Sequence, residues 1–161
     1  MIDLISIIIA TYNRPESLAK VLESFLAQKL PQGLNYEVIL VDNNSKDNTK
    51  EVAASFERKF QGRLKYFSES QQGKPYALNR GIREAKGDIL VFTDDDVVLD
   101  PLWLSEIVGC FEKNHCDGLG GRVLPIYPPR TPAWVKENPH ESAGAVVISD
   151  QGQGIQPFDP N

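Results

Sequence analysis

Cysteine, positive charge and long apolar runs are all scarce in this sequence of 161 residues. The two cysteines, Cys110 and Cys116, are too few for a structural zinc site, which normally has four ligands, and we interpret them as a reduced pair. Acidic residues outnumber basic ones, and the formal net charge is −5. This charge argues against a nucleic-acid partner, because proteins that bind a phosphate backbone normally carry a basic face.

No apolar run is long enough to cross a membrane, so the sequence predicts no transmembrane segment in this chain. The first residues lack the basic side chains that open a signal peptide, and the apolar run after them ends at Thr11. We therefore expect a cytoplasmic location. The inner face of the membrane stays open as a location for the full-length protein.

Short β-branched runs alternate four times with apolar residues at helical spacing. The expected strands are residues 4–10, 36–41, 64–67 and 88–93, and a helical pattern follows each of them. This alternation predicts an α/β fold, in which a mostly parallel central sheet is covered by helices to form a three-layer sandwich.

Local signals are expected to bound the helices. Asn13, with Glu16 three residues later, has the capping-box spacing for the first helix, and the turn-forming Asn43–Ser45 offers a cap for the second. After the fourth helix, residues 122–124 and 143–148 are further candidate strands, with a proline-rich stretch between them.

A polar cluster follows three of the four expected strands. Thr11–Asn13 follow the first strand, Asp42–Asn44 the second and Asp94–Asp96 the fourth. In an open parallel sheet the carboxyl ends of the strands line one crevice. The coincidence of the three clusters predicts a ligand site at that edge.

The acidic triplet Asp94–Asp96 is the strongest of the three signals. In an extended backbone Asp94 and Asp96 point to one side and Asp95 to the other. Two carboxylates roughly 6 Å apart repel by about 3 kcal/mol at an effective dielectric constant of about 20, so a proton or a cation must offset the repulsion. Oxygen ligands favour Mg²⁺ or Mn²⁺, with phosphate oxygens completing the shell. The alternative is that the triplet only caps the turn after the strand.

Two further residues are candidates for holding a nucleotide. Asp42 ends the second strand, as does the acidic residue that binds a ribose hydroxyl in dinucleotide-binding folds, and Lys74 can reach a phosphate from the start of a helix. A local Asx turn at Asp42 and a merely exposed Lys74 are the alternatives. Neither a P-loop nor a G-x-G-x-x-G turn occurs in the sequence.

Four motifs together resemble family 2 glycosyltransferases with the GT-A fold, which is Rossmann-like. They are Ile7–Arg14, Val41–Thr49, Gly73–Gly81 and Phe92–Asp96, and Gly120–Val123 is also similar. The resemblance implies that residues 4–124 form a domain that binds a nucleotide sugar, the donor. It also implies that residues 125–161 begin the acceptor-side region.

The resemblance assigns expected roles to the matching residues. Asp42 would hydrogen-bond the base, and Asp96 would hold the metal that bridges the diphosphate. The expected nucleotide-binding residues are Ala10, Thr11, Asn13, Asp42, Lys74, Asn79, Asp94 and Asp95, and the expected metal ligands are Asp96 and Asp94.

The activity implied by the resemblance is the transfer of a sugar, with inversion, from a UDP- or GDP-sugar to a hydroxyl of a saccharide or lipid-linked acceptor, with Mn²⁺ or Mg²⁺ as cofactor. The acidic base of the family lies in a Glu-Asp segment well beyond the triplet, and no Glu-Asp pair follows Asp96 here. We therefore expect a fragment that lacks the catalytic base and is impaired in transfer.

Two other functions remain open, a non-catalytic nucleotide-binding domain and a sugar nucleotidyltransferase. The second would need a glycine-rich loop after the first strand, and Thr11–Pro15 contains no glycine.

Overall fold

The computed structural model describes residues 2–114, 116–127 and 129–137. The chain divides into two compact units, residues 1–115 and 116–161. The domain boundary after residue 124 that the resemblance implies stays a prediction. The elements in chain order are β1 (Leu4–Thr11), α1 (Pro15–Leu26), β2 (Asn35–Asp42), α2 (Thr49–Phe60), β3 (Leu64–Ser68), α3 (Lys74–Glu84), β4 (Ile89–Thr93), α4 (Trp103–Asn114) and α5 (Ala133–Glu137). The candidate strand at 143–148 lies outside the described residues.

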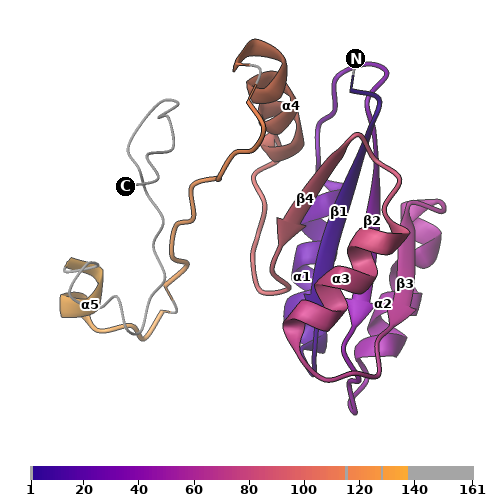
Figure 1. Cartoon of the computed structure of the whole chain (residues 1–161). Coiled ribbons are helices and arrows are strands. Elements are labelled where there is room, and N and C mark those ends of the chain that lie inside the picture. Colours follow the sequence, from indigo (N-terminus) through magenta and orange to yellow (C-terminus); the bar gives the residue numbers. More distant parts are fainter. Residues whose placement is uncertain (1, 115, 128, 138–161) are drawn as a thin grey trace. The chain divides into compact units, whose positions relative to one another are not determined.

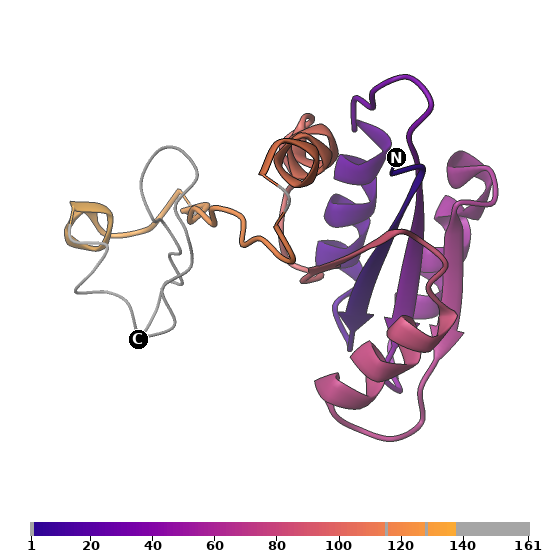
Figure 2. The same ribbon diagram turned by 45° about the horizontal axis from the view of Figure 1, so that its top comes forward.

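The four strands of the first unit form one parallel sheet in the order β3-β2-β1-β4. The α3 helix covers one face, and α1 and α2 cover the other (Figures 1 and 2). The predicted α/β three-layer sandwich is therefore confirmed. Because the chain runs from β1 outward to β3 and then returns to place β4 on the far side of β1, the strand order reverses between β1 and β4. Open α/β sheets bind ligands at such a point.

The central strand β1 is apolar along its length because both of its faces are buried. Ile5, Ile7 and Ile9 belong to the larger core cluster, to which α1, α2 and α4 contribute, whereas Ile8 packs under α3. Burial of such a side chain contributes roughly 1.5–3 kcal/mol relative to exposure. The α3 helix comes so close to β1 that a Cβ atom on Gly81 would lie 2.4 Å from Cγ2 of Ile8. This close packing holds the C-terminal half of α3 against the middle of β1.

Two predicted helix caps are wrong. No side chain caps α1, because Asn13 adopts a left-handed backbone (φ 51°) and its Oδ1 accepts a hydrogen bond from the Lys46 backbone N–H. Nor does α2 begin at Asn43–Ser45; it begins at Thr49, where Asp47 Oδ1 accepts a hydrogen bond from the Thr49 backbone N–H. For α1, therefore, a contact with the β2–α2 connection takes the place of the predicted cap.

The predicted strand at 122–124 is also wrong, since only Val123 forms an isolated bridge. Pro125, which follows directly, has no backbone N–H to donate to a neighbouring strand. Farther along the second unit, α5 is a short helix. Within residues 2–114, 116–127 and 129–137, no helix has both the length and the apolar character needed to cross a membrane.

Candidate nucleotide and metal site

An open pocket of about 440 Å³ lies in the first unit, at the carboxyl ends of β1 and β4, where the strand order reverses. The strand ends and the connections that follow them supply its walls. The lining residues are Ala10, Thr11, Tyr12, Arg14, Asn43, Gln72, Gly73, Lys74, Asp94, Asp95 and Asp96. The polar clusters after β1, β2 and β4 thus meet at one place, as the sequence predicts.

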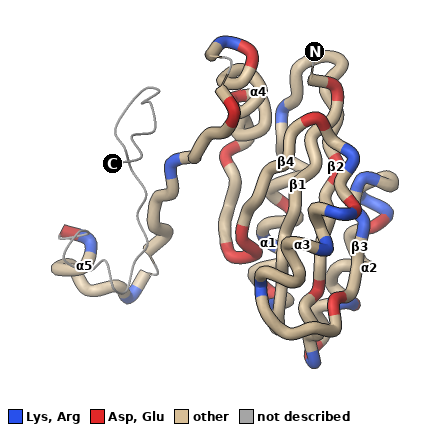
Figure 3. The backbone as a smooth tube through the Cα atoms, viewed as in Figure 1, with Lys and Arg blue, Asp and Glu red and all other residues tan. Residues whose placement is uncertain are grey.

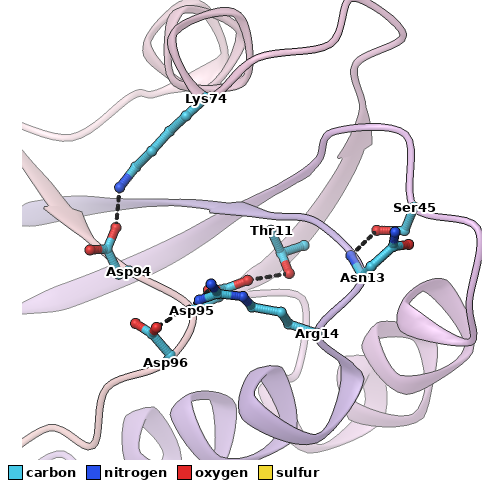
Figure 4. A network of polar contacts seen from close by, with 8 residues as sticks. All are labelled: Thr11, Asn13, Arg14, Ser45, Lys74, Asp94, Asp95 and Asp96. Carbon is cyan, nitrogen blue, oxygen red and sulfur yellow. Dashed lines mark hydrogen bonds and ion pairs between the residues drawn. The ribbon is translucent and has the colours of Figure 1, made fainter. Parts of the chain in front are cut away.

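The acidic triplet after β4 forms one wall of the pocket, and its three side chains point to different partners (Figure 4). Asp95 is only 5% exposed, and its Oδ2 accepts a hydrogen bond of 2.6 Å from Thr11 Oγ1. Asp94 and Asp96, by contrast, are exposed and line the same pocket, where Lys74 contacts Asp94 and Arg14 contacts Asp96.

Two cationic side chains reach the triplet from opposite sides. Arg14 Nη1 lies 2.6 Å from Asp96 Oδ2 and 3.3 Å from Asp95 Oδ1, and the attraction of Asp95 and then Asp96 raises the pKa of Arg14 above its usual value. Lys74, the first residue of α3, forms an ion pair with Asp94 (Figure 4). Three carboxylates and two cationic groups leave this wall with one net negative charge. The acidic stretch is the red segment that follows β4 in Figure 3.

Asn43 holds the connection between β3 and α3 against the pocket. Its side chain is buried, and its Nδ2 donates hydrogen bonds to the carbonyl oxygens of Gln71 (2.7 Å) and Glu69 (3.2 Å). Its Oδ1 accepts hydrogen bonds from the Gly73 N–H (2.6 Å) and from Gln72 Nε2 (3.4 Å). One asparagine therefore fixes the position of the residues just before Lys74.

Asp42 lies beside the pocket without lining it. Its Oδ2 accepts a hydrogen bond of 2.7 Å from the Tyr66 hydroxyl, and its Oδ1 accepts one of 2.8 Å from the Ser45 N–H. Burial and the neighbouring Asp42 carboxylate raise the pKa of Tyr66, so this hydroxyl remains a donor at neutral pH. The carboxylate of Asp42 is thus held in one orientation, and its contact with a base stays a prediction.

Six predicted site residues line the pocket, namely Ala10, Thr11, Lys74, Asp94, Asp95 and Asp96. Asn13 does not line it, because its backbone N–H donates to Ser45 Oγ at 2.9 Å and the residue belongs to the connection with α2. Asn79 lies on the exposed side of α3. The nucleotide contacts expected of Asn13 and Asn79 stay predictions.

Five lining residues have no binding role in the sequence analysis, although Tyr12 and Asn43 belong to its polar clusters. They are Tyr12, Arg14, Asn43, Gln72 and Gly73. Arg14 has a signal in hindsight, since it is a basic residue directly after a polar strand end in an acidic chain. At Gly73 the backbone has a φ of 133°, which residues with a side chain rarely adopt, so this position favours glycine.

The oxygen atoms of the pocket can hold a divalent cation only together with further oxygen atoms from a bound phosphorylated ligand. Among the described residues, no group of three or more His, Cys, Asp or Glu side chains is placed to hold a metal by itself. Asp94 and Asp96 are, however, exposed carboxylates, and Mg²⁺ is commonly bound by one or two carboxylates together with substrate phosphates and water. The residues present therefore fit a cation shared with a phosphorylated ligand.

Comparison with known proteins identifies the family. Residues 6–157 match the model described as glycosyl transferase family 2. The chain belongs to this family. Among curated relatives, it is 36% identical over 124 residues to the glycosyltransferase AglE of Haloferax volcanii, a match that covers 77% of this chain and 40% of AglE.

Solved structures of GT-A glycosyltransferases share the fold. The mannosyltransferase PcManGT from Pyrobaculum calidifontis, in complex with GDP-Man and Mn²⁺, superposes with a TM-score of 0.64 and 26% identity over 80% of this chain and 36% of its own. Glucosyl-3-phosphoglycerate synthase from Mycobacterium tuberculosis was solved in complex with Mn²⁺, UDP and glucosyl-3-phosphoglycerate. It superposes with a TM-score of 0.55 and 27% identity, over 69% of this chain and 40% of the synthase chain. The chain thus spans 40% or less of the length of each of these three proteins.

Proposed function

We propose that this chain binds a UDP- or GDP-sugar together with Mn²⁺ or Mg²⁺ in the pocket between β1 and β4. The proposed activity of the whole protein is metal-dependent transfer of the sugar, with inversion, to a hydroxyl of a saccharide or lipid-linked acceptor. One observation carries the proposal. In a family 2 glycosyltransferase, Asp94 and Asp96 stand exposed at the point where the strand order reverses, opposite Lys74 at the start of α3.

The charge of the pocket supports a role for a divalent cation. The wall formed by the triplet, Arg14 and Lys74 carries one net negative charge, which would repel a diphosphate. A divalent cation held by Asp94 and Asp96 reverses that sign and provides ligand positions for phosphate oxygens. Two structural neighbours were crystallised with Mn²⁺ and a nucleotide, which favours the same arrangement here.

Each part of the pocket then has a proposed task. Asp94 and Asp96 hold the cation, which when bound offsets the charge of the departing diphosphate. Asp95 keeps the triplet attached to β1 through Thr11. Ala10 and Thr11 line the nucleoside portion, and Lys74 neutralises a phosphate oxygen. Asp42, held by Tyr66, orients the base.

Thermal unfolding tests the proposal directly. UDP or GDP should raise the melting temperature in the presence of Mn²⁺ or Mg²⁺ and have little effect when EDTA removes the metal, because a ligand that binds only the folded state stabilises it. The substitution Asp96→Asn should abolish the metal-dependent rise, whereas Asp117→Asn, a change of the same kind at an exposed position outside the pocket, should leave it intact. Identical melting curves with and without every combination of metal and nucleotide would overturn the proposal.

A further inference from the structure

Arg14 forms an ion pair with the Asp96 carboxylate, which the proposed function assigns to the metal. Its Nη1 lies 2.6 Å from Asp96 Oδ2, a distance typical of a charged hydrogen bond. The guanidinium stays charged at every relevant pH, because arginine is not deprotonated in proteins. A metal that binds Oδ2 would meet this positive charge, so Arg14 opposes metal binding at Asp96 as long as it stays in place.

The contacts of Asp95 allow this displacement without loss of the site. Asp95 is buried and bonded to Thr11 at 2.6 Å, whereas its contact with Arg14 is longer, at 3.3 Å. Loss of Arg14 therefore leaves the triplet attached to β1. The Arg14 side chain is also about half exposed and lines the same pocket, so it is free to change partner there.

We infer that Arg14 competes with the divalent cation for Asp96 and, once displaced, pairs with the diphosphate, so that metal and nucleotide bind as one coupled event. This inference rests on the proposed function. In the free protein Arg14 and Lys74 each neutralise a carboxylate of the triplet, which weakens the binding of a metal alone. When metal and diphosphate arrive together, the displaced guanidinium gains a new anionic partner and can bind it with two parallel N–H donors.

The coupling predicts two effects of opposite sign in one variant. Arg14→Gln should bind Mn²⁺ alone more tightly, by roughly two- to five-fold, because an exposed ion pair of modest strength no longer competes. The same variant should show a smaller increase of Mn²⁺ affinity when UDP or GDP is added, because the freed cation is missing. A residue that only supported the structure would weaken both interactions.

Titration of Mn²⁺ followed by electron paramagnetic resonance measures both quantities without any sugar transfer. The titrations compare Mn²⁺ alone with Mn²⁺ in the presence of UDP, and then of GDP. Lys20→Gln removes one exposed positive charge from α1 outside the pocket and should change neither affinity. Arg14→Lys keeps the charge, so its affinity for Mn²⁺ alone should stay near that of the unmodified chain.

The outcomes separate this inference from the proposed function. If the unmodified chain binds Mn²⁺ no more tightly with UDP or GDP than without, the proposed function fails and the inference with it. If nucleotide does tighten Mn²⁺ binding but Arg14→Gln binds Mn²⁺ alone equally or more weakly, only the inference is overturned. If circular dichroism shows that Arg14→Gln does not fold, the affinity of Arg14→Lys for Mn²⁺ alone is the deciding measurement. An affinity near that of the unmodified chain supports the inference, and a several-fold gain contradicts the competition between Arg14 and the metal.

Discussion

Replacing Asn43 by alanine would remove the side chain that holds the β3–α3 connection to the end of β2. The four hydrogen bonds of this side chain include two short ones, of 2.7 Å to the Gln71 carbonyl and of 2.6 Å from the Gly73 N–H. A hydrogen bond contributes about 0.5–1.5 kcal/mol net, and buried groups left without a partner cost more. The two short bonds alone therefore predict a loss of about 2 kcal/mol in the free energy of unfolding.

Urea denaturation followed by circular dichroism measures this loss, because the free energy of unfolding can be extrapolated linearly to zero denaturant. Asn35→Ala is a matched control at the start of β2, the strand that Asn43 follows. Asn35 is exposed, and its side chain donates one long hydrogen bond, of 3.3 Å, to the Gly33 carbonyl. Asn43→Asp keeps the shape but turns the donor into an acceptor facing two carbonyl oxygens, so it should be at least as destabilising as alanine. If Asn43→Ala were as stable as Asn35→Ala, Asn43 would not hold this connection.

Two further predictions concern the core and the far end of the sheet. Gly81→Ala should destabilise the protein by about 1–3 kcal/mol, because the new Cβ meets Ile8 at 2.4 Å, whereas Gly109→Ala in α4 meets nothing within 4 Å and should be neutral or stabilising; equal effects in thermal melts would contradict the close packing. Burial acts to raise the pKa of Glu37, but hydrogen bonds from Lys65, from a serine hydroxyl and from a backbone N–H outweigh it and lower the pKa. A lowered folded-state pKa contributes stability that is complete above the unfolded-state pKa of about 4.3 and is lost as the pH falls through the folded-state pKa. The stability difference between the unmodified chain and Glu37→Gln should therefore shrink when urea titrations are moved from pH 7 to below pH 4, and a constant difference would refute this reasoning.

The sheet and the place of the site could be predicted because their causes are local and periodic. Four apolar runs separated by helical patterns determine a parallel sheet, and the carboxyl ends of its strands bring Thr11 and the triplet together. The identity of the buried carboxylate could not be predicted in this way. Strand alternation sets Asp95 apart from Asp94 and Asp96 but does not say which side is buried. Asp95 is the buried one and accepts a hydrogen bond from Thr11, a contact across 84 residues that no short-range pattern records.

The roles of polar residues in the connections were also beyond sequence patterns. Asn13 has the spacing of a helix cap, yet it binds Lys46 of a different connection. Asn43 was recognised as turn chemistry, but its function depends on four partners from the segment 69–73. A polar side chain in a loop can satisfy its hydrogen bonds locally or over a long range, and only the folded arrangement decides between them.

In the proposed function, the pocket between β1 and β4 binds a nucleoside diphosphate through a divalent cation held by Asp94 and Asp96. A crystal structure of the chain grown with UDP or GDP and Mn²⁺, with anomalous data collected at the manganese absorption edge, tests it most directly. We predict an anomalous peak beside the carboxylates of Asp96 and Asp94, with the diphosphate on the other side of the metal and Arg14 no longer bonded to Asp96. Nucleotide bound elsewhere, or nucleotide in the pocket with no metal at the triplet, would contradict the account.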